Sequence, residues 1–183
     1  MAALFVSLIH YPVLDRNGRI ITSAITSLDL HDIARSARTY GARGFFVVHP
    51  VAEQREFARS VLAHWLNGYG RRFDSRRREA LDLIHIVETL EQMIETSHSL
   101  CGAPPLLIYT SARAPNGISF DELRAKVRES SAPIILMFGT GFGLAPAMLE
   151  RADLVLEPIH GSGDYNHLSV RAAAAIMLDR LCG

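Results

Sequence analysis

The last third of this 183-residue chain contains a short apolar run that leads directly into a glycine-rich segment. Residues 134–138 read Ile-Ile-Leu-Met-Phe, which is typical of a strand buried on both faces of a parallel sheet. Glycine then stands at positions 139, 141 and 143, where it permits a sharp turn and a close approach of the backbone to a ligand. Ligands of open α/β sheets bind at the carboxyl ends of the strands, so this segment predicts a binding site. A purely structural tight turn would explain the same glycines.

The pattern of a short apolar segment followed by a helical segment repeats along the chain. Apolar runs predict six strands, at residues 3–10, 44–49, 81–87, 105–110, 134–138 and 154–156. Six helices are expected at residues 30–40, 52–67, 88–100, 120–129, 144–150 and 168–181. Asp29, Ser119 and Asn166 are the expected N-caps of three of them. This order predicts one three-layer α/β domain over residues 1–183, with a mostly parallel sheet.

Composition limits the class of protein. The chain is 49% hydrophobic and 21% charged, as in ordinary globular domains, and its apolar runs are too short to span a membrane. The N-terminus lacks the basic leader and cleavage site of a secretory signal. Its two cysteines form neither a metal-binding spacing nor a disulfide framework, and no other spacing suggests a metal ion. We therefore expect a cytoplasmic protein without a bound metal.

Arginine dominates the cations, since Lys126 is the one lysine among 19 lysine and arginine residues. Five arginines lie between residues 71 and 78, next to Tyr69 and Phe73. Two interpretations of residues 68–78 stay open. The segment is either a solvated loop or a patch that follows an RNA backbone and stacks on bases.

Three segments resemble the SPOUT (α/β-knot) RNA methyltransferases. They are Leu107-Ile-Tyr-Thr-Ser-Ala-Arg113, Gly139-Thr-Gly-Phe-Gly-Leu-Ala145 and the run from Leu156 to Val170. The chain looks most similar to a branch of small, predicted S-adenosylmethionine-dependent RNA methyltransferases. The resemblance implies a C-terminal trefoil knot, a structure that periodicity alone does not indicate. It also implies S-adenosyl-L-methionine as cofactor and an RNA substrate, either tRNA or rRNA.

The resemblance further implies which residues bind the cofactor. Positions of the family's apolar adenine slot match Leu156, Pro158, Ile159 and Leu168. The loop that passes the ribose matches Gly139, Thr140 and Gly141, and the first loop matches Thr110, Ser111 and Ala112. Further expected cofactor contacts in the third segment are Glu157, Gly161, Tyr165, Asn166 and Ser169.

Three residues are candidates for catalysis. Asp164 is the expected carboxylate for removing a proton from the target, and His167 lies in the same turn before the last helix. The ribose-methylating branch carries an arginine six residues before a glycine, and Arg35 has that spacing to Gly41. Because His167-Leu-Ser169 departs from the pattern of that branch, methylation of a base nitrogen and of a ribose 2′-oxygen both stay open. The RNA species and the nucleotide are open as well.

The last helix is apolar on most faces, which is unusual for a helix at a chain end. In the family, dimers form through this region, so we expect a homodimer through the C-terminal helix. Two alternatives to an active methyltransferase are a non-catalytic RNA-binding knot protein and, based only on Gly-x-Gly-x-Gly, an NAD-dependent oxidoreductase. The oxidoreductase fits less well, because a dinucleotide fingerprint belongs in the first strand–helix unit of a sheet.

Overall fold

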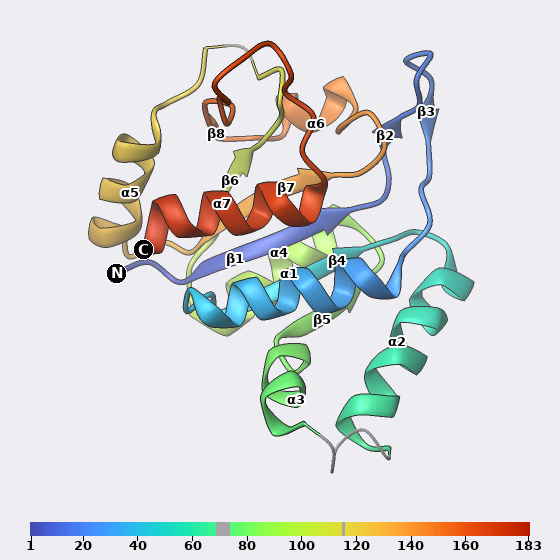
Figure 1. Cartoon of the computed structure of the whole chain (residues 1–183). Helices are drawn as coiled ribbons and strands as arrows, with labels where there is room; N and C mark the ends of the chain where they lie inside the picture. The colour runs from blue at the N-terminus through green and yellow to red at the C-terminus, as the bar shows by residue number, and fades with distance from the viewer. Residues whose placement is uncertain (69–73, 115) are drawn as a thin grey trace.

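The computed structural model describes residues 1–68, 74–114 and 116–183. Its centre is a six-stranded sheet in the order β5-β4-β1-β7-β6-β8, and each pair of neighbouring strands is parallel (Figure 1). The strands are β1 (Leu4–Ile9), β4 (Gly44–Val48), β5 (Ile84–Val87), β6 (Leu106–Tyr109), β7 (Ile134–Gly139) and β8 (Leu154–Val155). The predicted α/β class and the predominantly parallel sheet are therefore confirmed.

Helices cover both faces of this sheet. One face is covered by α1 (Ser27–Thr39), α2 (Ala52–Leu66), α3 (Ser75–Leu81), α5 (Phe120–Glu129) and α7 (Val170–Cys182). The other carries α4 (Leu90–Cys101) and α6 (Pro146–Glu150). In Figure 1, α1 and α7 run side by side across the middle of the sheet. Of the helices in the described ranges, none has the length and apolar character needed to cross a lipid bilayer.

Strand β1 shows why the apolar runs form the centre of the fold. All six of its residues are buried, and their side chains alternate between two hydrophobic cores. Leu4, Val6 and Leu8 belong to the core under α1 and α7, whereas Phe5 and Ile9 belong to the core under α4. Ser7 is the one polar residue of the strand, and its hydroxyl donates to the carbonyl of Leu136 at 3.1 Å. A strand buried on both faces needs a nearly continuous apolar sequence, and that is the pattern on which the strand predictions depended.

A small hairpin projects beside the carboxyl edge of the sheet (Figure 1). Strands β2 (Val13–Leu14) and β3 (Ile20–Ile21) pair antiparallel across a turn in which Gly18 has φ 75°. The Asn17-Gly18 sequence is a strong turn former because both residues tolerate positive φ. Val13 also forms an antiparallel bridge with Leu144, so the hairpin is joined to the segment that follows β7.

The N-cap prediction for Asp29 was wrong. Thr26 caps α1, because its side chain accepts a hydrogen bond from the backbone N–H of Asp29. Asp29 instead lies in the first turn of the helix, where a negative charge interacts favourably with the helix dipole. The prediction for Ser119 was correct, and Ser119 forms a capping box with Glu122 at the start of α5.

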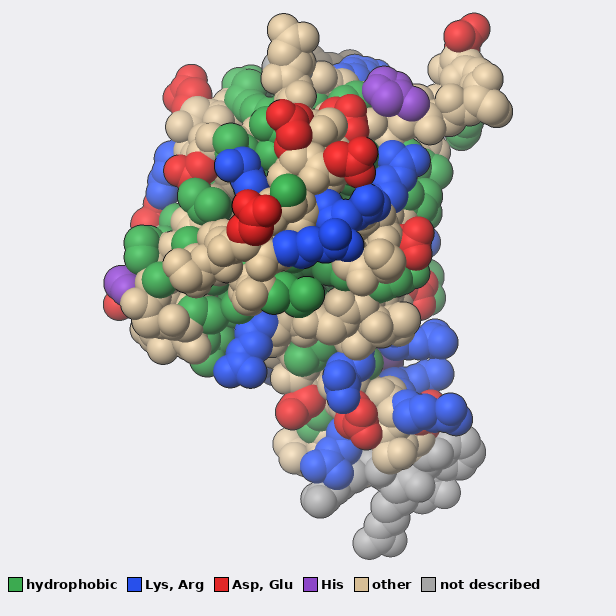
Figure 2. Space-filling view, turned by 90° about the vertical axis from the view of Figure 1, so that its left-hand side faces the viewer, with side chains coloured by type: hydrophobic (Ala, Val, Ile, Leu, Met, Phe, Trp, Pro, Cys, Tyr) green, Lys and Arg blue, Asp and Glu red, His purple; other side chains and the backbone are tan. Residues whose placement is uncertain are grey.

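The arginine-rich stretch is partly helical, so the interpretation of residues 68–78 as one loop was wrong. Asp74 caps α3 by accepting the backbone N–H groups of Arg76 and Arg77, and the following strand begins only at Ile84. The guanidinium of Arg77 lies 4.6 Å from the ring centroid of Trp65, which fixes α3 against α2. Cationic side chains gather at this lower end of the molecule (Figure 2). The remaining residues of the predicted patch, Tyr69, Arg71, Arg72 and Phe73, lie outside the described residues.

Candidate functional site

A pocket of about 550 Å³ opens at the carboxyl edge of the sheet, over the ends of β6 and β7. This volume is within the range of small-molecule sites. One side consists of segments that follow strands: residues 110–113, the glycine loop (residues 139–143), and parts of the long loop (residues 157–169). The other side consists of the segment that leads into α1 and the first turns of α7. The pocket thus lies where the sequence predicted a binding site.

The glycine loop has a geometry that only glycine permits. A Cβ on Gly139 would lie 2.7 Å from the backbone nitrogen of Leu144, and one on Gly141 would lie 2.8 Å from the carbonyl oxygen of Leu14. Gly141 and Gly143 also have positive φ angles of 59° and 109°. Hydrogen bonds join the loop to β2, since Phe142 donates to the Leu14 carbonyl (3.0 Å) and Leu14 donates to the Gly143 carbonyl (2.9 Å). The loop is therefore held in one shape before any ligand binds.

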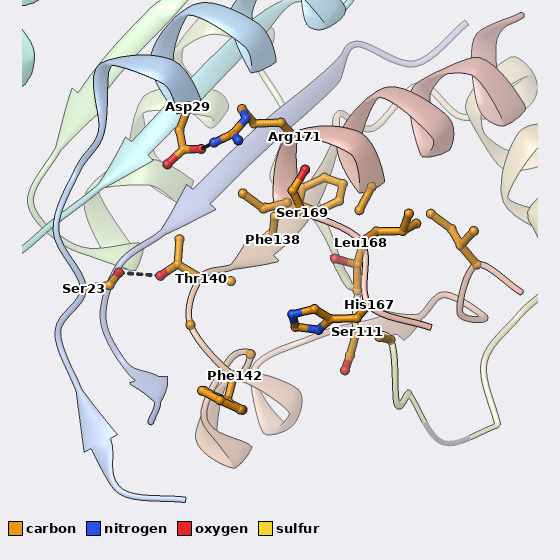
Figure 3. A pocket seen from close by; sticks show the side chains of 18 of the residues that line it. Ser23, Asp29, Ser111, Phe138, Thr140, Phe142, His167, Leu168, Ser169 and Arg171 are labelled. Atoms are coloured by element: carbon orange, nitrogen blue, oxygen red, sulfur yellow. Dashed lines mark hydrogen bonds and ion pairs between the residues drawn. The ribbon is translucent and has the colours of Figure 1, made fainter. Parts of the chain in front are cut away.

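A polar chain leads from the glycine loop into the protein interior. The hydroxyl groups of Thr140 and Ser23, which both line the pocket, form a short hydrogen bond (Figure 3). The Ser23 hydroxyl also lies 2.9 Å from Nδ1 of His10, a fully buried residue. Burial, with His49 as a second cause, lowers the pKa of His10 from 6.5 to about 4. His10 is thus neutral near pH 7 and supports the pocket wall without adding charge.

His49 fixes the same segment from behind. The backbone N–H of Val51 donates to Nδ1 of His49 at 3.1 Å, so Nε2 carries the proton and donates to the Ser23 carbonyl at 2.9 Å. Burial lowers the pKa of His49 as well. Both oxygen atoms of Ser23, in its hydroxyl and its carbonyl, are therefore held by buried imidazoles.

The first loop contributes residues that were predicted to contact the cofactor. Thr110, Ser111 and Ala112 line the pocket. The hydroxyl of Thr110 is buried and donates to the carbonyl of Met137 at 2.7 Å, which ties the end of β6 to β7. Ser111 is half-buried, and its hydroxyl accepts the backbone N–H of Arg113 at 3.1 Å.

The long loop divides into residues that line the pocket and residues that do not. Ile159, Asn166, His167, Leu168 and Ser169 line it. Gly161, Asp164 and Tyr165 are exposed and lie outside the lining, with Tyr165 81% exposed. Asn166 is not the N-cap of α7, contrary to prediction. Ser169 caps the helix by accepting the backbone N–H of Ala172 at 3.2 Å.

Four other predicted residues lie away from the pocket. Leu156 is fully buried in the core, and Glu157 accepts the backbone N–H of Phe120 at 2.8 Å, which supports the start of α5. Pro158 is half-buried outside the lining. Arg35 is exposed on α1 and does not line the pocket of its own chain. The three predicted catalytic residues therefore separate, and only His167 lines the pocket.

An ion pair forms the wall opposite the loops, and the sequence reasoning did not anticipate it. Nη1 of Arg171 donates to Oδ1 of Asp29 at 2.7 Å, and both residues line the pocket (Figure 3). Nε of Arg171 lies 3.5 Å from Oδ2 of Asp32. One signal was present in the sequence. Arg171 stands in the first turn of a helix, where a cation is unfavourable unless it has a partner.

No metal centre is indicated by the described part of the chain. Within it, no group of three or more His, Cys, Asp or Glu side chains is placed to hold a metal ion. The pocket combines apolar side chains with hydroxyls, glycine backbone, the Asp29–Arg171 ion pair and the cation Arg113. Its apolar and glycine-rich part suits an uncharged, partly apolar group of a ligand that backbone groups recognise.

Comparison with known proteins relates the chain to one family. Residues 3–183 match the model of a family described as SAM-dependent RNA methyltransferase. An uncharacterized protein of Aquifex aeolicus is 41% identical over 97% of this chain and 87% of its own length. A tRNA (guanine-N(1)-)-methyltransferase of Oleidesulfovibrio alaskensis is 41% identical over 98% of this chain. The match covers only 42% of that relative, so the larger part of it has no counterpart here.

Solved structures support the fold. The SpoU methyltransferase AviRb from Streptomyces viridochromogenes, in complex with AdoMet, matches with a TM-score of 0.54 and 17% identity, over 97% of this chain and 56% of that one. A TrmH/SpoU tRNA modifying enzyme of A. aeolicus matches with a TM-score of 0.58 and 14% identity, over 99% of this chain and 74% of that one. At such identities the likeness concerns the arrangement of the chain alone.

Proposed function

Since this chain belongs to the family of SAM-dependent RNA methyltransferases, we propose that the pocket binds S-adenosylmethionine beside a nucleotide of a tRNA. The cofactor supplies an activated methyl group, and the protein holds both partners in position. One observation carries the proposal. Three segments that follow strands, and that are far apart in the sequence, line one pocket. One of the three is the fixed glycine loop.

Fit to the cofactor is supported by the tight course of the glycine loop. At positions 139 and 141 a Cβ would meet the backbones of Leu144 and Leu14, so only glycine lets the loop lie in this place in the pocket lining. We assign the adenosyl group to the side formed by Ser111, Thr140, Ile159 and Leu168. The other predicted cofactor residues that line this side are Thr110, Ala112, Gly139, Gly141, Asn166 and Ser169. The predicted cofactor residues outside the lining would act indirectly, by supporting the loops or closing over them. They are Leu156, Glu157, Pro158, Gly161 and Tyr165.

The adjoining side, which meets the adenosyl side at the Ser23–Thr140 hydrogen bond, is left for the RNA. There the segment Ser23–Asp29 and the start of α7 offer hydroxyls and charged groups. His167 lies between the two sides and is our candidate for contacting the target nucleotide. Asp164 would reach the pocket only if the long loop closes, and Arg35 only in the pocket of a second subunit.

A homodimer would give Arg35 such a role, and it forms part of the proposal. Several apolar residues of α7 are only half-buried in the single chain: Val170, Ala172, Ala173, Ala175 and Ile176. Size-exclusion chromatography with light scattering should give twice the chain mass of 20.2 kDa. Ala172→Glu should reduce the mass to that of a monomer, whereas Asp179→Ala, at an exposed position of the same helix, should not. A wild-type monomer at micromolar concentration would contradict the dimer.

The trefoil knot and the extent of the domain are also proposals. The backbones of Ile118 and Glu157 are joined by a 2.9 Å hydrogen bond, after which the chain continues into α7 between α1 and α5. This close passage supports threading of the C-terminal segment through the loop after β6. Mechanical unfolding by pulling on both chain ends should then tighten the knot, so that the extended chain is shorter than an unknotted chain of the same number of residues. Full extension to the length of an unknotted chain would contradict the knot.

Two hydrophobic cores on the faces of one sheet support a single domain over residues 1–183.

Transfer of labelled methyl groups tests the activity. We expect the purified protein to label tRNA from cells that lack the gene, and not tRNA from cells that have it. The name of the O. alaskensis relative points to tRNA, but its guanine-N1 reaction can reside in the part that this chain does not match. A cofactor-binding protein that labels neither tRNA nor rRNA would instead be an RNA-binding member without catalysis.

We place the protein in the cytoplasm, where these RNAs are modified, and cell fractionation tests this placement.

A further inference from the structure

Asp29 is the one carboxylate among the described residues that line the pocket. It lies in the first turn of α1 and is 6% exposed. Figure 3 shows it and Arg171 pointing toward one another at one wall of the pocket. Asp164, the carboxylate expected from the sequence, lies outside this lining.

Hydrogen bonds hold the Asp29 carboxylate in one orientation and leave part of it free. The hydroxyl of Thr26 donates to Oδ2 at 2.7 Å, and Nη1 of Arg171 donates to Oδ1 at 2.7 Å. An ionised carboxylate offers about four lone-pair sites, so about two remain for a further donor. The group is therefore oriented, lines the pocket and can accept another hydrogen bond.

Arg171 can keep a partner when the charge on Asp29 changes. Its Nε lies 3.5 Å from Oδ2 of Asp32, a half-buried residue one turn further along α1. If Asp29 takes up a proton, Asp32 still opposes the charge of Arg171. The Arg171 side chain is also 34% exposed, so solvent screens its charge and a neutral Asp29 leaves no buried cation unpaired, with or without Asp32.

We propose that Asp29 accepts the proton that the RNA target atom loses during methyl transfer, an inference that rests on the proposed function. As the new carbon–nitrogen or carbon–oxygen bond forms, the electron pair of the N–H or O–H bond stays on the RNA atom. The proton passes to a free lone pair of Asp29, and the electron pair of the carbon–sulfur bond stays on the donor sulfur. The acceptor is then an atom that bears a hydrogen, such as an imide nitrogen or a ribose hydroxyl.

Asp29→Asn separates this role from a purely structural one. The asparagine keeps the shape and an oxygen for Arg171 but cannot take up a proton. We expect the single-turnover rate of methyl transfer to tRNA from cells lacking the gene to fall about 100-fold or more. Asp32→Asn is the matched control, since it removes the other carboxylate beside Arg171. Because that ion pair is long and partly exposed, at 3.5 Å with side chains 34% and 47% exposed, the control rate should stay within about fivefold of wild type.

Binding of tRNA in the presence of S-adenosylhomocysteine gives a second readout. An accepting Asp29 favours the unmethylated atom, so wild-type protein and Asp32→Asn should bind unmodified tRNA more tightly than tRNA already methylated by the enzyme. Asp29→Asn should lose this preference while binding S-adenosylhomocysteine as wild type does.

Equal losses of rate in Asp29→Asn and Asp32→Asn, or a wild-type rate in Asp29→Asn, would overturn the assignment. If Asp29→Asn does not melt cooperatively, Asp29→Glu carries the test, since it keeps a carboxylate in a shifted position. It should keep the preference for unmodified tRNA at a reduced rate, and losing the preference would refute the proposal. Wild-type protein that labels no RNA would refute the proposed function itself, before any variant is compared.

Discussion

The glycine loop and the long loop line the same pocket, but the chain holds them very differently. The glycine loop bonds to Leu14 on one side and to Ser23 on the other, and three glycines fix its course. Residues 160–165 of the long loop are all exposed, and no backbone hydrogen bond joins residues 158–168 to the rest of the described chain. One wall of the pocket is therefore formed in advance, and the other can adjust around a ligand.

Acidification should destabilise the wall formed by the glycine loop more than the long loop. The folded-state pKa of His10, about 4, lies below the ordinary value of 6.5, so neutral His10 contributes fully above about pH 6.5. This contribution is lost as the pH falls from about 6.5 toward about 4, and it amounts to roughly 3 kcal/mol of the free energy of unfolding. Urea unfolding between pH 7 and pH 4 measures it.

Two variants connect this loss to His10. His10→Asn should show a shallower decrease of the unfolding free energy with falling pH. His160→Asn, in the exposed long loop, should follow the wild-type curve. Identical curves for wild type and His10→Asn would mean that the buried imidazole does not govern the acid sensitivity of this wall.

Alanine at a glycine position compares the two loops directly. In Gly139→Ala the new Cβ would meet the backbone nitrogen of Leu144 at 2.7 Å, so we expect a loss of about 2 kcal/mol in unfolding free energy. Gly163→Ala is the matched control, because its Cβ would have no neighbour within 4 Å and the change should cost less than about 0.5 kcal/mol. Thermal unfolding measures both. Equal stability of the two variants would remove the distinction between the loops.

The hydroxyl of Ser23 should have the smallest effect of the three. Ser23→Ala removes the partner shared by Thr140 and His10, at a cost of about 1 kcal/mol in stability. The hydroxyl of Thr140 would then be free to turn, so affinity for S-adenosylhomocysteine should fall as well. Ser162→Ala, an exposed serine of the long loop, is the control. An unchanged affinity in Ser23→Ala would show that the backbone alone fixes the glycine loop.

The sequence predicted the sheet well because its central strands β1, β4 and β7 are buried on both faces. Such strands need continuous apolar runs, which are visible without knowing their neighbours. The glycine loop was predictable for a similar reason, since its shape depends on residues within the loop. Leu156 and Glu157, which were predicted to contact the cofactor, lie outside the pocket lining, because the end of a strand can support a site from below without reaching it. Leu156 is buried in the core, and Glu157 supports the start of α5.

The wall formed by α1 and α7 could not be predicted from local patterns. Its ion pair joins Asp29 to Arg171, 142 positions apart in the sequence, and Ser23 lies 117 positions from Thr140. The misassigned N-caps have a related cause. Thr26 and Asp29 are both suitable caps within one turn, as are Asn166 and Ser169, and tertiary contacts decide between them. Asp29 is in contact with Arg171, so its side chain serves the pocket wall.

Titration calorimetry with S-adenosylhomocysteine tests the central claim that the glycine loop forms half of a cofactor site. We expect binding at one site per chain, lost in Gly139→Ala protein that still melts cooperatively and retained in Gly163→Ala. NAD should bind more weakly or not at all, since the family assignment argues against an oxidoreductase. The account would be contradicted if folded wild-type protein gave no binding at millimolar ligand, or if Gly139→Ala bound as tightly as wild type.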